Sequence, residues 1–303
     1  MDRRQRMAVG VQALDRWMDD LVRGGLASLE TVGSAPWSRQ ARRLVDAQAP
    51  GLARWVGSLA AVPGSGPDWP EVLLGELGRI ALLTEAFQRF DDLPPPLQDD
   101  VLRRLGWSLR KPEVLERGER VRDRWVVLGC VEEEDELLRT RRDWLAGLDT
   151  GRIALVLQFA HGSRRFDTKL DPGTVVEGEL CFWPGANPQR ALLVEGQSSG
   201  VTVDDLPGHE DIDGLLDRVS TELARDPWAH RFGGALRQVV PVFWKDEWWL
   251  RDHHGRALAF RSDHPWSLLA LSGGHPVDVA VEWDHRFLSP LAVVADGVYQ
   301  VLR

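Results

Sequence analysis

A chain of 303 residues, of which 43% are apolar and 27% charged, has the composition of a soluble globular protein and is long enough for two domains. The net charge of −9 argues against general affinity for nucleic acid, because phosphate binding requires clustered positive charge. The sequence contains no run of 18 apolar residues that would predict a membrane span, and the N-terminus lacks the apolar segment of a secretory signal. We therefore expect a cytoplasmic protein that does not enter a membrane.

The first part of the chain shows the apolar spacing of amphipathic helices. In its first element, apolar residues recur at steps of three and four: Leu14, Trp17, Met18, Leu21, Val22, Leu26 and Leu29. A later helix is expected to begin at Asp68, with Glu71 completing a capping box and Pro70 in the first turn. A short helix is expected to follow around residues 97–105. We therefore predict a helical bundle domain over residues 1–118.

One stretch of this helical part, residues 42–60, combines a glutamine with a proline. At 100° per residue, one face carries Leu44, Gln48, Leu52, Trp55 and Leu59. Pro50 lacks an N–H group and its ring displaces the carbonyl of Asp46, so we predict a kinked helix, or two helices that meet near Ala49. Gln48 or Asp46 would pair with the freed backbone groups, since a buried polar group without a partner costs about 1–3 kcal/mol. These residues and Trp55 are structural or interaction candidates.

After about residue 118 the spacing changes to the alternation of β-strands. Short apolar runs, among them WVVLGC, WSLLALS and YQVL, are separated by turn sequences such as DPG, SGGHP and ADG. Residues 133–146 alternate as a hairpin would, whereas residues 210–225 have helical spacing. We therefore predict an α+β protein. Its second domain, residues 119–303, is an antiparallel β-rich domain, barrel-like or sandwich-like, with an inserted helix near 210–225.

Two short segments match the sequence pattern of a catalytic or metal-binding motif. GQSSG matches the G-x-S-x-G pattern of a hydrolase, with Ser198 as the nucleophile, but no helix is expected directly behind it. Asp252, His253 and His254 offer carboxylate and imidazole ligands, yet DHHGR also has the composition of a hairpin turn. Asp211 is expected to cap the inserted helix. We assign no catalytic residue, no cofactor and no metal ligand, and keep Ser198 and the Asp-His-His sequence as alternatives.

Two adjacent tryptophans, Trp248 and Trp249, belong to the β-rich region. Exposed aromatic side chains on a strand can stack on nucleic-acid bases, but binders of this kind also need a basic groove. Residues 119–303 contain 21 basic and 30 acidic side chains, so this region is the acidic one. We therefore expect these tryptophans in the protein core or at an interface with another protein.

Several phrases of the sequence together indicate a family. LVDAQAPGLARWVGSLA, preceded by DLVRGGLASL, resembles the segment downstream of the zinc finger in bacterial SWIM zinc finger family proteins. VRDRWVVLG, FWPGANPQRAL, WWLRDHHGRAL and WSLLALSGGHPVDVAVEWD follow in the same order. The family's CxC…CxH finger is absent from this sequence, so no zinc ligand of the family carries over to a residue here.

The resemblance also implies partners. Proteins of this family tend to be encoded beside a MoxR-type AAA+ ATPase and a von Willebrand factor A-type protein. Because no catalytic constellation is evident, we predict a non-enzymatic interaction or adaptor module that works with such proteins. Two alternatives stay open: a hydrolase-like enzyme with a cryptic site around Ser198, and a nucleic-acid-binding protein.

We predict that the purified chain contains no stoichiometric zinc. The two cysteines, Cys130 and Cys181, lie in separate apolar runs and cannot form a structural four-ligand site by themselves. Elemental analysis after dialysis tests this, with a finger-containing family member as the positive control. A content of about one zinc per chain would contradict the prediction and direct attention to the histidines.

Overall fold

The computed structural model describes residues 2–135, 138–162 and 164–302 and has an α+β fold, as predicted. It separates into two compact units. The helical unit contains Met1–Lys111 together with the short segments Pro184–Ala186 and Asp226–Trp228, and the β-rich unit contains the other residues. The domain boundary at residue 118 stays a prediction. Within the described ranges, no helix is both long and apolar enough to cross a membrane.

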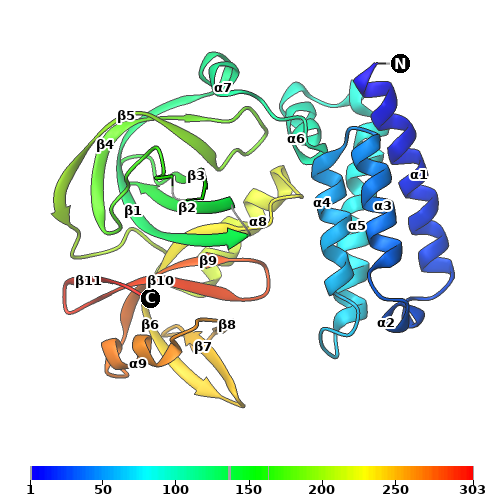
Figure 1. Ribbon diagram of the computed structural model, residues 1–303. Helices are drawn as coiled ribbons and strands as arrows, with labels where there is room; N and C mark the ends of the chain where they lie inside the picture. Colours follow the sequence, from blue (N-terminus) through cyan, green and yellow to red (C-terminus); the bar gives the residue numbers. More distant parts are fainter. Residues whose placement is uncertain (1, 136–137, 163, 303) are drawn as a thin grey trace. The chain divides into compact units, whose positions relative to one another are not determined.

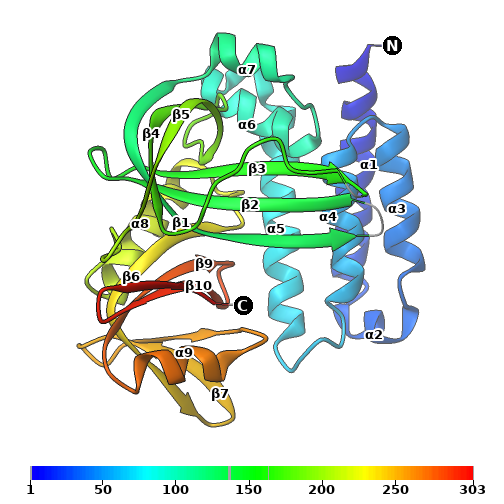
Figure 2. The same cartoon turned by 60° about the vertical axis from the view of Figure 1, so that its left-hand side comes forward.

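The helical unit is built from six α-helices in its described residues, and in Figures 1 and 2 the long ones run alongside one another. They are α1 (Arg3–Arg23), α2 (Leu29–Val32), α3 (Ala35–Asp46), α4 (Pro50–Ser58), α5 (Trp69–Gln88) and α6 (Pro95–Leu105). Pro70 lies in the first turn of α5 as predicted, but the predicted capping box there is wrong. Asp68 is the N-cap residue, yet its backbone at ψ 11° is not extended, so its side chain makes no capping hydrogen bond.

The junction of α3 and α4 explains why Gln48 and Pro50 occur in the middle of this apolar stretch. Two helices meet at Ala49, as predicted, and Pro50 is the first residue of the second one. The N–H of Gln48 donates to Val45 O and that of Ala49 donates to Leu44 O, both at 2.9 Å. These two bonds, with Gln48 at φ 61°, form a Schellman motif that ends α3.

The predicted role of Gln48 on a buried stripe is therefore wrong. The helical phase ends at Asp46, so Gln48 lies half-buried in the turn, in the left-handed conformation that usually requires glycine. Within the described residues, the side chains of Gln48 and Asp46 form no hydrogen bond at the junction, because backbone groups satisfy one another there.

The residue after the proline, Gly51, allows α4 to contact the end of α6. A Cβ atom on Gly51 would lie 2.4 Å from Arg104 O and 2.7 Å from the nitrogen of Gly106. Gly106 adopts φ 100° at the end of α6, and its own Cβ would lie 2.8 Å from Cγ of Pro50. Backbone therefore packs directly on backbone at this contact, which leaves no space for a side chain at either position.

We predict that Gly51→Ala destabilises the helical unit by about 1–3 kcal/mol, because the added methyl group would overlap backbone atoms. The control is Gly75→Ala in α5, where no described atom lies within 4 Å of the added Cβ. This control should stabilise the protein by about 0.5–1 kcal/mol, the usual gain in a helix interior. Urea denaturation followed by circular dichroism measures both. Equal effects of the two substitutions would show that the contact is not tight.

The β-rich unit begins with α7 (Lys111–Arg117) and a closed barrel with the strand order β1-β2-β3-β5-β4. Its strands are β1 (Arg120–Asp135), β2 (Leu138–Gly147), β3 (Ile153–His161), β4 (Thr174–Phe182) and β5 (Arg190–Thr202). The hairpin predicted over residues 133–146 is present as the antiparallel pair β1–β2, and its turn, residues 136–137, lies outside the described residues.

A second, six-stranded sheet follows in the order β11-β10-β8-β7-β6-β9, and β9 also pairs with β10. Its strands are β6 (Phe232–Trp244), β7 (Glu247–Arg251), β8 (Ala257–Phe260), β9 (Val277–Trp283), β10 (Leu288–Ala295) and β11 (Val298–Val301). The predicted inserted helix is α8 (Ile212–Arg225), with the Asp211 side chain accepting from Gly214 N at 2.8 Å as its cap. The predicted strand WSLLALS is instead part of α9 (Pro265–Ser272), since a short apolar run does not distinguish the two structures.

The barrel packs on this sheet through an apolar layer and one buried carboxylate, that of Glu282 on β9. Glu282 is 2% exposed and accepts from Trp144 Nε1 at 2.7 Å, Arg142 Nε at 3.0 Å and Arg231 Nη1 at 2.6 Å. Arg142 also donates to Glu133 at 2.8 Å. Burial lowers the pKa of Arg142, but the two carboxylates outweigh this effect and raise the pKa above its ordinary value. This network joins β2 of the barrel to β9 of the sheet.

We predict that Glu282→Gln destabilises the β-rich unit by about 3–5 kcal/mol, because it leaves buried arginine charge without its carboxylate. Glu195→Gln is the control, since Glu195 pairs with Arg122 at the surface and both side chains are largely exposed. A surface pair of this kind is worth about 0–1 kcal/mol. Thermal unfolding of both variants gives the comparison, and a Glu282→Gln melting temperature equal to that of the control would refute the prediction.

Candidate functional site

The hairpin formed by β6 and β7 carries aromatic side chains on both of its faces. Phe243 pairs directly with Trp248, and Val242 pairs directly with Trp249. Because side chains alternate along a strand and directly paired residues share a face, the first pair and the second pair lie on opposite faces. We call residues 242–249 the aromatic hairpin.

On the first face, an aromatic cluster joins the hairpin to α9. The ring centroid of Trp248 lies 5.0 Å from that of Phe243, 5.8 Å from that of Phe260 and 4.9 Å from that of Trp266. Phe243 is 50% exposed and Trp266 is 65% exposed. Large aromatic side chains that gather at the surface in this way are typical of an interaction site.

The second face forms a small apolar pocket of about 320 Å³. It is lined by Val242, Trp244, Trp249, Arg251 and Ala257. Trp244 is 56% exposed, and Nε1 of Trp249 is buried without a hydrogen-bond partner within the described residues. The hairpin thus presents apolar surface on both sides, and Trp248 and Trp249 point to different pockets.

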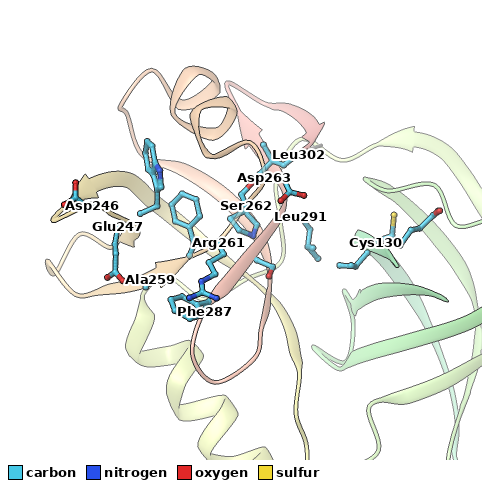
Figure 3. A pocket seen from close by; sticks show the side chains of 16 residues that line it. Cys130, Asp246, Glu247, Ala259, Arg261, Ser262, Asp263, Phe287, Leu291 and Leu302 are labelled. Carbon is cyan, nitrogen blue, oxygen red and sulfur yellow. The ribbon is translucent and has the colours of Figure 1, made fainter. Parts of the chain in front are cut away.

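A larger groove, about 830 Å³, lies beside the first face (Figure 3). It occurs where the sheet is interrupted along β10. Leu288 pairs with Phe260 of β8, while Leu291 O accepts from Leu302 N at 3.0 Å directly after β11, so Ser289 and Pro290 have neither strand as a partner on that side. Asp246 and Glu247 lie at one end of the lining residues and Cys130 at the other in Figure 3. We call this cavity the acidic groove.

The charges of the acidic groove are unevenly balanced. Asp246, Glu247 and Asp263 line it without an ion-pair partner among the described residues. Glu132, at the barrel side, is paired with two arginines of β2. The guanidinium of Arg261 lies over the ring of Phe287, 3.6 Å from its centroid, and has no carboxylate partner in the described structure. Free negative charge therefore exceeds free positive charge in the lining.

The hydrolase alternative finds little geometric support. Ser198 lies within β5, where its backbone pairs with Val176, and the strand continues to Thr202. Its hydroxyl donates to Thr174 Oγ1 at 3.5 Å and accepts from Gly200 N at 3.3 Å. No hydrogen bond joins Ser198 to a histidine in the described part of the chain. The strand, turn and helix of a nucleophile elbow are not found at this position.

The residues of the metal-binding alternative, Asp252, His253 and His254, are instead engaged in contacts that support the fold. The Asp252 carboxylate accepts from Ile212 N at 3.0 Å and from Arg256 N at 2.9 Å, so it supports the start of α8 and closes the turn after β7. His254 Nε2 lies 3.6 Å from Asp211 Oδ2, and the ring of His253 packs on that of His254. Among the described residues, no group of three or more His, Cys, Asp or Glu side chains is placed to hold a metal ion.

The remaining candidates, Trp55 and Asp46, lie in the helical unit. Trp55 Nε1 donates to Glu76 Oε2 at 2.6 Å, which joins α4 to α5. Asp46 is exposed at the end of α3. Sequence reasoning missed Phe243, because nothing local distinguishes an exposed aromatic residue from a buried one. The alternation of β6 and β7 could have placed Phe243 on the face of Trp248, whereas Trp266 joins them from α9.

Comparison with known proteins identifies the helical part. Residues 2–105 match the family model of the SWIM-associated four-helix bundle domain, a range that contains α1 to α6. A search of curated proteins and a search of solved structures found no match. The helical part is therefore similar to a SWIM-associated four-helix bundle, and the β-rich unit lies outside the matched range.

Proposed function

We propose that this chain is a non-enzymatic adaptor, which acts in the cytoplasm and binds a protein partner through the aromatic hairpin and α9. The observation that carries the proposal is the exposure of Phe243, Trp244 and Trp266 around a packed aromatic cluster. Aromatic side chains contribute a large share of binding free energy at protein interfaces. The unpaired carboxylates beside the cluster argue against a nucleic-acid partner, because they would repel phosphate.

The identity of the partner rests on the resemblance to SWIM zinc finger family proteins. Their usual neighbours are a MoxR-type AAA+ ATPase and a von Willebrand factor A-type protein, and we propose these two as partners. The match of residues 2–105 to a SWIM-associated bundle supports the assignment to this group of proteins. The contact that we propose is made by the aromatic surface of the β-rich unit.

We predict that the purified chain binds a MoxR-type ATPase or a von Willebrand factor A-type protein from the same organism. The double substitution Phe243→Ser/Trp266→Ser should weaken this binding at least about tenfold, which corresponds to about 1.4 kcal/mol. Isothermal titration calorimetry measures both affinities. The control is Val201→Ser, because Val201 is an apolar side chain that is 69% exposed on β5, away from the hairpin.

Two outcomes would contradict the proposal in different ways. If the unmodified chain binds neither protein, the assigned partners are wrong. If it binds one of them and the double variant binds equally well, the partner is correct but the aromatic hairpin is not the binding surface.

A further inference from the structure

The acidic groove combines three features that together select a ligand. Its floor lies at the interruption of the sheet along β10, so it is an extended depression and not a closed cavity. Trp248 provides aromatic surface along it, with Phe260 buried behind Trp248 and the ring of Phe287 covered by Arg261. Asp246 and Asp263 provide carboxylates that come from two separate segments, the turn of the aromatic hairpin and the residues after β8, whereas Glu247 pairs directly with Trp244 on the second face of the hairpin.

The carboxylates are free to bind a cation from outside. Asp246 and Asp263 are exposed and have no ion-pair partner in the described structure, whereas Glu132 is already shared by Arg139 and Arg141. Among the lining residues that the structure describes, the opposing charge without a carboxylate partner is the guanidinium of Arg261, which is stacked on an aromatic ring. Two free carboxylates against this guanidinium leave the described lining complementary to positive charge.

The aromatic lining narrows the choice of cation. Lysine and arginine side chains place their methylene groups on apolar surface while their charged ends reach carboxylates, and both are attracted to the faces of aromatic rings. An extended peptide can present such side chains at regular intervals along a groove. A nucleic acid would bring phosphates to the carboxylates and is disfavoured.

We propose that the acidic groove binds a basic, extended segment of the partner protein, with arginine or lysine side chains between small apolar ones. This inference rests on the proposed adaptor function and specifies the chemistry of the partner at that surface. The basic side chains contact Asp246 and Asp263, and the apolar ones contact Trp248. Arg261 opposes binding through its charge and favours segments whose own acidic groups can face it.

The test uses the full chain and two fluorescein-labelled nine-residue peptides, three repeats of Arg-Pro-Leu and three repeats of Glu-Pro-Leu. Fluorescence anisotropy should show that the arginine peptide binds at least about tenfold more tightly than the glutamate peptide, and that its affinity falls as salt is added. The double substitution Asp246→Asn/Asp263→Asn should weaken arginine-peptide binding at least about fivefold. Arg261→Gln should strengthen it, an effect that a purely structural role of Arg261 would not produce.

The matched control is Glu116→Gln/Asp204→Asn. It changes the net charge by the same amount, and both residues are exposed in the β-rich unit, outside the groove, without an ion-pair partner among the described residues. It should leave the arginine-peptide affinity unchanged. Circular dichroism establishes that each variant is folded.

Three results would overturn the inference. They are equal affinity for the two peptides, an equal loss of affinity in the control double variant, and displacement of the arginine peptide by equimolar spermidine. The last would show that any small polycation fills the groove. Failure of this test leaves the calorimetric experiment on the aromatic hairpin unaffected, since Phe243 and Trp266 do not line the groove.

Discussion

The burial of Glu282 is the constraint on which the β-rich unit depends. A carboxylate that is 2% exposed is stable only if donors replace its lost water, and here Arg142, Trp144 and Arg231 supply them. Two of these donors belong to β2 of the barrel, whereas Glu282 belongs to β9 of the sheet. The requirement for hydrogen bonds to Glu282 therefore favours the pairing of β2 with β9 across the two sheets. The surrounding apolar contacts are not directional and select this pairing less specifically.

The acidic groove follows from the same arrangement. With β9 and β10 held against the barrel, β8 and β11 share one edge of β10 and leave a gap between them. The aromatic hairpin lies beside this gap, and Phe243 and Trp244 on its two faces are 50% and 56% exposed. An aromatic surface therefore lies next to a charged depression, which is the combination expected of a surface that binds a peptide segment.

The helical unit shows a different kind of constraint, one that acts through the backbone. Gly51 and Gly106 allow two helix ends to touch, and the Schellman motif at Gln48 directs the chain from α3 into α4 so that Pro50 begins the second helix. The segment that resembles SWIM-family sequences therefore owes its pattern to a helix junction and a close helix contact. Such a motif identifies a fold, while binding is assigned to a surface elsewhere in the chain.

The sequence by itself determined the parts of this protein that depend on near neighbours. Periodicity predicted the helical bundle, the change to strands and the hairpin over residues 133–146, and the position of Asp211 ahead of an apolar repeat predicted a cap. Apolar spacing did not predict the left-handed Gln48, which a local Schellman motif produces, and only the tertiary structure decided that Pro265–Ser272 is a helix and that Phe243 meets Trp266. Contacts such as the one between Arg142 and Glu282 join residues 140 positions apart. The spacing of residues along the chain does not predict such a pair, because the pairing is selected by the free energy of burying the two groups together.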